Sequence, residues 1–424
     1  MTTEPRLSFS KGEDILSYIS HALGYWPVDS LVCITMSGNV IGATLRTNLH
    51  ESDFAGDCVS GSRASVRGAP RTDLDRYVGE FLCYLAEDKS ADGALLAVFG
   101  SRDWVESVQI PQRKMMETLQ TALARAGKPV KHSWYVGPEH WRSYYCTDGD
   151  CCGWPGHPVS RITDSALNAE LIFRGSTYES GPRMLARDAA DPLAKAPRRA
   201  ISLESEACAR LLAGRQCFDE QFRATLEAWE LALSGGPAVP DHGTCGFLLA
   251  SLESVTVRDS VLVLCSVGPQ LALEGAAACG LLEPTSLSPV RPSGWHPSAD
   301  ELDGLRDIFS ADTDCPVDDF GHVLVGQGRS RPDWGRIARA ADVLVYLARA
   351  GSGESRAAAL TMLAWLQWCR GRGTAADSYL VLALAASPGY RLAVLLQELL
   401  GTGSVCGWAR NRSTAWNPTP GEAA

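Results

Sequence analysis

The densest group of residues able to do chemistry lies between an aromatic segment and a run of Gly and Pro. Cys146, Cys151, Cys152 and His157 fall within twelve positions, together with two aspartates. Thiolate sulfur and imidazole nitrogen are common ligands of Zn²⁺, and four such groups complete a tetrahedral site. These four residues are therefore the candidate metal ligands, with zinc as the possible cofactor.

The spacing of the cysteines leaves alternatives open. Zinc sites usually present two cysteines separated by two residues, because a tight turn must aim both sulfurs at one ion. Here four residues follow Cys146, and then Cys151 and Cys152 are adjacent. Adjacent side chains point in different directions in most backbone conformations, so a metal would need an irregular loop. Reduced structural thiols, a metal site, and redox chemistry or a disulfide all fit this stretch.

Other catalytic signatures are incomplete. There is no phosphate-binding loop of the Gly-x4-Gly-Lys-Ser/Thr type. Residues 264–268 resemble half of a nucleophile elbow but lack its first glycine, so we expect a buried apolar segment there. Asp148 and Asp150 form a carboxylate pair without a third partner, which is more typical of a turn than of acid/base catalysis.

Length and composition are those of a globular protein. The 424 residues, 45% hydrophobic and 21% charged, suffice for a substantial core and two domains. The sequence contains no apolar run of about eighteen residues, and its start lacks the features of a secretory signal. We therefore expect a soluble cytoplasmic protein with reduced cysteines and no membrane partner. The formal net charge of -10 repels phosphate, so no nucleic-acid partner is expected.

Residues 1–180 are predicted to form an α/β domain that carries the cysteine-rich hairpin or loop. The apolar periodicity indicates helices over 11–23, 74–85 and 112–126, a buried hairpin over 31–45, and strands over 95–99 and 132–136. This alternation predicts crossover units in a mixed, largely parallel sheet with flanking helices. Ligands favour the carboxyl ends of such strands. The carboxyl ends of the two predicted strands are residues 100–103 and 137–140. The cysteine segment follows residues 137–140, so we expect a pocket beside the cysteines.

The second half is predicted to be helical. Gly, Pro and basic residues indicate a linker over 181–201, followed by an all-α domain over 202–403. Its last helices are expected at 333–350, 354–370, 374–386 and 390–400. The tail over 404–424 carries Trp408 and Trp416 among polar residues and is expected to be loosely ordered.

One helical hairpin in this half resembles a tetratricopeptide unit. The residues that fall at the spacing of that repeat are Leu363, Ala364, Gly371, Ala376, Leu380, Ala383 and Pro388. An array needs about three copies, and the sequence shows one. We therefore expect a tetratricopeptide-like hairpin and not a peptide-binding solenoid.

Three blocks of sequence carry a resemblance to a known family. In chain order they are residues 24–32, residues 141–156, and the late segments 363–365 and 385–390. With them the chain resembles, from about residue 8 to 408, the domain-of-unknown-function 4192 family of high-GC Gram-positive bacteria. In that family the double cysteine is usually followed directly by proline, whereas Gly153 and Trp154 intervene here. The resemblance implies a bacterial cytoplasmic protein with the cysteine segment as a family feature, and it implies no activity.

Two functions from different classes fit these observations. We favour a non-enzymatic interaction, assembly or small-ligand-binding protein, whose C-terminal helices bind a protein partner. This function predicts an exposed apolar patch around Trp365, Trp368 and Tyr379. The alternative is a metal-assisted hydrolase, in which the four candidate ligands hold zinc with an open position that activates water. It predicts a cavity beside the cysteines and a nearby carboxylate, Asp148 or Asp150.

Overall fold

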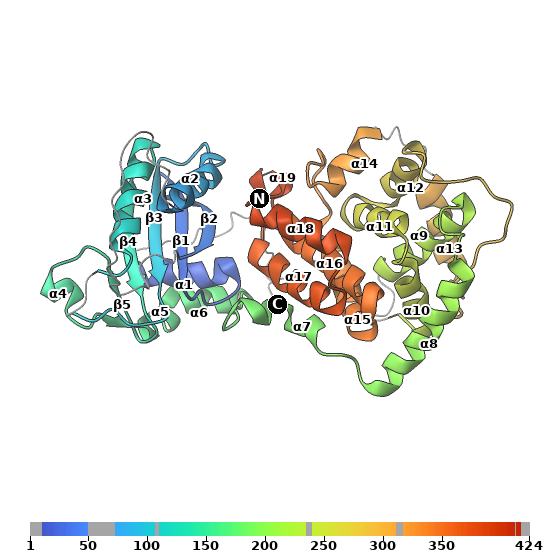
Figure 1. Ribbon diagram of the computed structural model, residues 1–424, viewed down its shortest axis with the longest axis horizontal. Coiled ribbons are helices and arrows are strands. Elements are labelled where there is room, and N and C mark those ends of the chain that lie inside the picture. Colours follow the sequence, from blue (N-terminus) through green and yellow to red (C-terminus); the bar gives the residue numbers. More distant parts are fainter. Residues whose placement is uncertain are drawn as a thin grey trace, which may run out of the picture. The chain divides into compact units, whose positions relative to one another are not determined.

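The computed structural model describes residues 11–49, 73–106, 110–234, 240–310, 317–411 and 413–416. These residues form two compact units, an α/β unit that ends at Pro182 and a helical unit that begins at Arg183 (Figure 1). The division falls inside the segment 181–201, which is itself largely helical: the 3-10 helix η2 (Pro182–Ala186), α7 (Arg187–Ala190) and the start of α8 lie in it. In the described part of the chain, no helix is long and apolar enough to cross a membrane.

The α/β unit is built on a six-stranded sheet in the order β2-β1-β3-β4-β5-β6. The strands are β1 (Ser30–Ser37), β2 (Val40–Asn48), β3 (Gly93–Phe99), β4 (Val130–Val136), β5 (His140–Ser143) and β6 (His157–Pro158). The pair β3–β4 is parallel, whereas β1–β2, β1–β3, β4–β5 and β5–β6 are antiparallel. The expected strands and hairpin are confirmed, but the prediction of a largely parallel sheet is wrong.

The connections explain the direction of the strands. A tight turn at Gly38 joins β1 to β2, and α2 (Asp73–Ala86) then leads to β3 on the far side of β1. Strands β2 and β3 therefore run in the same direction, with the antiparallel β1 between them. A crossover makes the strands that it joins parallel, but it does not make them neighbours. The unit β3–α3–β4, with α3 over Arg113–Arg125, is the crossover that pairs its own strands.

Helices cover both faces of the sheet (Figure 1). Helix α1 (Gly12–Leu23) packs with α5 (Ser160–Thr163) and α6 (Ala166–Phe173). Strand β1 shows the two cores directly: Leu31 and Cys33 belong to the cluster with α2 and α3, and Val32 and Ile34 belong to the cluster with α1. Strands buried on both faces read as continuous apolar runs, which is why the sequence showed no alternation here.

The helical unit contains the longest helices of the chain. Its elements after α7 are α8 (Lys195–Leu212), α9 (Asp219–Leu233), α10 (His242–Ser251), α11 (Val255–Val267), α12 (Pro269–Ala278), α13 (Ala299–Ser310), α14 (Val317–Leu324), α15 (Trp334–Ala350), α16 (Gly353–Cys369), α17 (Gly373–Ala386), α18 (Arg391–Gly401) and α19 (Gly407–Arg410). The four helices expected between 333 and 400 are confirmed. Helices α16 and α17 pack closely together, but their likeness to a tetratricopeptide unit stays a prediction. Residues 264–267 lie in the buried helix α11, as expected for an apolar segment.

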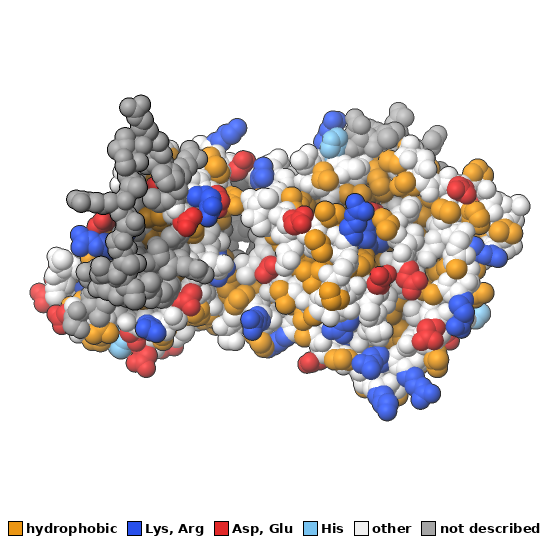
Figure 2. Space-filling model, in the orientation of Figure 1, with side chains coloured by type: hydrophobic (Ala, Val, Ile, Leu, Met, Phe, Trp, Pro, Cys, Tyr) orange, Lys and Arg blue, Asp and Glu red, His pale blue; other side chains and the backbone are white. Residues whose placement is uncertain are grey.

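The three residues expected to form an apolar patch on the C-terminal helices are not exposed. Trp365, Trp368 and Tyr379 are all buried. The indole of Trp365 donates to the carbonyl of Leu324 at 2.9 Å, and that of Trp368 donates to the carbonyl of Ser404 at 2.8 Å. On the face shown in Figure 2, apolar side chains of this unit are interspersed with charged ones. The predicted partner-binding anchors are therefore core residues.

Residues 404–411 are packed against the helical core. Trp408 is 1% exposed, its ring lies 6.1 Å from that of Trp365, and its indole donates to the carbonyl of Gly328 at 2.9 Å. The large apolar area of one tryptophan outweighs its polar neighbours in sequence. The expectation of a loose tail is wrong for residues 404–411, and residues 412 and 417–424 lie outside the described part.

Candidate metal-binding site

The structure brings the three predicted cysteine ligands together just after β5. The Sγ atoms of Cys146, Cys151 and Cys152 all lie within 4.8 Å of one another, and those of Cys151 and Cys152 are 3.7 Å apart. All three are free thiols. In a tetrahedral site with Zn–S bonds of about 2.3 Å, two sulfurs lie about 3.8 Å apart. The thiols are thus already close to the spacing that one ion requires.

A single helical turn produces this arrangement. Helix α4 (Gly149–Cys152) begins after Asp148, whose carboxylate accepts a hydrogen bond from the backbone N–H of Asp150 at 2.9 Å. The backbone N–H of Cys152 donates to the carbonyl of Asp148 at 2.8 Å. The turn is regular, so the irregular loop that adjacent cysteines were expected to require is not needed. Asp148 acts as a helix cap, the turn-forming role that its sequence suggested.

The three thiols differ in exposure and in acidity. Cys152 is buried, Cys146 is half-buried and Cys151 is exposed. A hydrogen bond with the backbone of Asp148 lowers the pKa of Cys146. Hydrogen bonding with the Cys152 and Cys146 side chains raises the pKa of Cys151 to about 11. Cys146 therefore ionises before Cys151, and the exposed Cys151 side of the cluster faces solvent.

His157, the fourth predicted ligand, lies on β6 next to these residues but outside their group. Its Nδ1 is 2.9 Å from Nη1 of Arg161, and its ring lies 4.7 Å from that of Trp141. Because a guanidinium only donates, Nδ1 must be the accepting nitrogen. The ring also hydrogen-bonds the backbone of Cys151, while burial and then Arg161 lower the pKa of His157. A role for His157 as a metal ligand stays a prediction.

Arg142 supports the cysteine turn from β5. Its Nη2 donates to the carbonyl oxygen of Cys146 at 3.2 Å. Its guanidinium carbon lies 3.9 Å from the ring centroid of Trp154 and 5.0 Å from that of Trp104. This contact could not be predicted from the sequence, because Trp104 is far from the cysteines in the chain. The aromatic block 141–145 was the one local sign of it.

A family comparison covers most of the chain. The family model described as a domain of unknown function, DUF4192, matches residues 13–278 and 335–404. The chain belongs to the DUF4192 family. The matched residues include the cysteine turn, Arg142 and both of its tryptophans. No curated protein and no solved structure matches the chain, so the geometry of this DUF4192 protein must carry the functional argument.

The strand ends at which a pocket was expected hold a second polar group in the DUF4192 chain. Asp103 follows β3, and Glu139 and His140 follow β4, with ligand atoms within 4.8 Å of one another. The Oδ1 atom of Asp103 accepts from the backbone N–H groups of Glu139 and His140 at 3.1 and 3.0 Å. A Cβ on Gly137 would lie 2.2 Å from that oxygen, so glycine is needed there. These contacts show Asp103 ordering the turn between β4 and β5.

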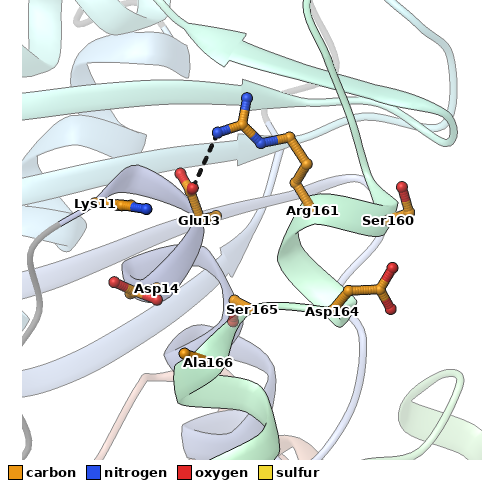
Figure 3. Close-up of a pocket in the computed structure, with 8 residues that line it drawn as sticks. All are labelled: Lys11, Glu13, Asp14, Ser160, Arg161, Asp164, Ser165 and Ala166. Atoms are coloured by element: carbon orange, nitrogen blue, oxygen red, sulfur yellow. Dashed lines mark hydrogen bonds and ion pairs between the residues drawn. The ribbon is translucent and has the colours of Figure 1, made fainter.

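An open cavity of about 400 Å³ lies elsewhere in the α/β unit, between the start of α1 and the segment α5–α6 (Figure 3). Its lining is Lys11, Glu13, Asp14, Ser160, Arg161, Asp164, Ser165 and Ala166. Glu13 and Arg161 point toward each other and form an ion pair at 3.2 Å. Lysine, arginine, aspartate and glutamate side chains line this cavity, and its lining includes no cysteine. The cysteines of the DUF4192 chain are therefore the stronger candidate site.

Proposed function

We propose that this DUF4192 protein binds one zinc ion through Cys146, Cys151 and Cys152 and uses the ion to bind a small ligand. The sulfur spacing is the observation that supports this function. Three thiolates are soft donors, which select zinc over the hard ions Mg²⁺ and Ca²⁺. Two of the thiols lie in the capped turn α4 and the third, Cys146, lies two residues before its cap, so few residues must be ordered to form the site.

The fourth coordination position is proposed to remain open to solvent. Among the described residues, no histidine or carboxylate joins the three thiols in one group. The His157 ring is engaged with Arg161 and with the backbone of Cys151. Zinc sites with three protein ligands and an open position bind water or substrate, whereas closed four-ligand sites are structural. An open position fits a binding function.

Ligand binding is favoured over metal-assisted hydrolysis. Hydrolysis also needs a carboxylate or histidine that can take a proton from the metal-bound water. The candidates for this role were Asp148 and Asp150. The carboxylate of Asp148 caps α4, and among the described residues neither carboxylate is grouped with the three thiols. Binding of a protein partner through the C-terminal helices is not carried forward, because Trp365, Trp368 and Tyr379 are buried.

The direct test is the zinc content of the full-length protein, purified without chelator and without affinity nickel. We expect about one equivalent, lost in a C151S/C152S variant. Cys279 is an exposed thiol in the helical unit, so Cys279→Ser is the matched control and should retain the metal. A His157→Gln variant should also retain it, since His157 is not one of the three proposed ligands. Protein that carries no zinc and takes up none when titrated would disprove the site.

A further inference from the structure

Arg142 is a buried cation that has no counter-ion in the part of the chain that the structure describes. The residue is 6% exposed. The ion pairs between described residues do not include Arg142. An unpaired buried charge is costly, and such groups are normally paired with an anion or a metal-bound ligand. The contact with the Cys146 carbonyl supplies one neutral acceptor. Within the described ranges, no carboxylate forms an ion pair with this guanidinium.

Unsatisfied donors gather at the same place. The Nε and Nη1 atoms of Arg142 are buried and have no hydrogen-bond partner among the described residues. The same holds for Nε1 of Trp104, whose ring lies under the guanidinium. Each of these atoms can donate and none can accept. Buried polar atoms without partners are rare in proteins and often mark an absent water or ion. A group made only of donors around a fixed positive charge is suited to an anion and unsuited to a metal ion.

The aromatic rings determine how such a ligand would meet Arg142. Trp154 and Trp104 cross at 85°, with their centroids 5.6 Å apart. The guanidinium carbon of Arg142 lies 3.9 Å from the centroid of the Trp154 ring, so this ring covers one face of the cation. Trp154 is 38% exposed and follows the exposed turn of α4. Because Trp154 lies outside the strands, it is a cover that can move without disturbing the sheet.

We propose that Arg142, together with the indole N–H of Trp104, forms a binding site for a small oxyanion group, a carboxylate or a phosphate. Trp154 turns aside to admit the ligand, whose oxygens accept the free N–H groups. This site goes beyond the zinc site, because Arg142 meets the cysteine turn through a backbone carbonyl and not through sulfur. The two sites are neighbours, so one anionic molecule can reach both.

Binding can be measured on the full-length protein with inorganic phosphate and with acetate, by titration calorimetry and by the shift in melting temperature. We expect saturable binding of at least one of these anions, weakened about tenfold or more in Arg142→Gln, since a charged guanidinium gives the strongest hydrogen bonds to an oxyanion. Arg161→Gln is the matched control, because Arg161 is a cation of the same unit that is already paired with Glu13. It should bind as the wild type does.

A second variant keeps the test decisive if Arg142→Gln fails to fold. Trp154→Ala removes the cover and leaves Arg142 in place, so the anion should bind more rapidly with affinity within about threefold of the wild type. The C151S/C152S protein should bind the anion unchanged, which separates this site from the zinc site. Absence of saturable binding by both anions, or equal affinity in the wild type and Arg142→Gln, would overturn the proposal.

Discussion

Sγ of Cys151 and Sγ of Cys152 lie 3.7 Å apart. The two residues are adjacent in the chain, and adjacent side chains usually point in different directions. The turn of α4 holds them in this relation, and Asp148 stabilises the turn by accepting the backbone N–H of Asp150. A single turn of helix is marginal by itself, so its cap has a large share in its stability. The cap is therefore expected to control the metal site.

Asp148→Ala should weaken zinc binding without removing a ligand. The loss of an N-cap costs about 1 kcal/mol, which corresponds to an affinity about five- to tenfold lower if the cost falls on the ordered turn. Competition with a chromophoric chelator measures the change. Asp150→Ala is the control, because Asp150 contributes its backbone to the cap and its side chain is not the cap. Equal affinities for the two variants would refute the role of the cap.

Alkylation of the metal-free protein should modify the half-buried Cys146 before the exposed Cys151. The pKa of Cys146 is lowered by the backbone of Asp148, whereas that of the exposed Cys151 is raised to about 11 by its thiol neighbours. The thiolate is the reactive form, so iodoacetamide at pH 7.5 should modify Cys146 before Cys151. Peptide mass spectrometry gives both rates. Cys152→Ser should speed the reaction of Cys151, because it removes a neighbour that raises the pKa of that thiol. Modification of Cys151 before Cys146 in the wild-type protein would contradict the prediction.

Stability should fall in mild acid because of His21. This buried ring lies 2.9 Å from Ser176 Oγ and 2.9 Å from Asn168 Oδ1, and burial lowers its pKa below the ordinary value of 6.5. Below pH 6.5 the unfolded chain thus binds more protons than the folded one. The contribution of the neutral His21 ring to the free energy of unfolding is therefore fully present above that pH and is lost as the pH falls.

Urea unfolding at a series of pH values tests this dependence. His21→Gln removes the titrating group and should flatten the decline between pH 6.5 and 5. His157→Gln is a useful comparison, because the pKa of His157 is also lowered but its ring is less buried. An identical decline in the wild type and in His21→Gln would exclude His21 as the source.

The ion pair of Glu230 with Arg336 should be worth far more than a surface pair. Two hydrogen bonds of 2.6 and 2.8 Å join the side chains, which are 3% and 14% exposed. Glu230→Gln leaves the guanidinium buried without its counter-charge, so we expect a loss of about 3 to 5 kcal/mol in the free energy of unfolding. Asp303→Asn breaks the exposed pair with Arg306 and should cost less than about 1 kcal/mol. Urea denaturation of both variants gives the comparison.

Much of the secondary structure could be predicted from the sequence. The hairpin over 31–45 and the helix over 333–350 depend on apolar periodicity, which is a property of neighbouring residues and needs no knowledge of the rest of the chain. The cysteine stretch was identifiable for the same reason, since its three thiols lie within seven positions. Local spacing thus determined which elements form and which residues are candidate ligands.

The tertiary structure decided how those pieces meet. The sequence indicated a crossover to β3, but not that β1 would lie between β2 and β3 and make the sheet mostly antiparallel. It placed Trp408 in a loose tail, whereas the core buries that ring. Arg142 likewise gained its importance from Trp104, a residue remote in the chain. Such contacts depend on burial between distant segments, and no local pattern of residue types encodes which distant partner will be chosen.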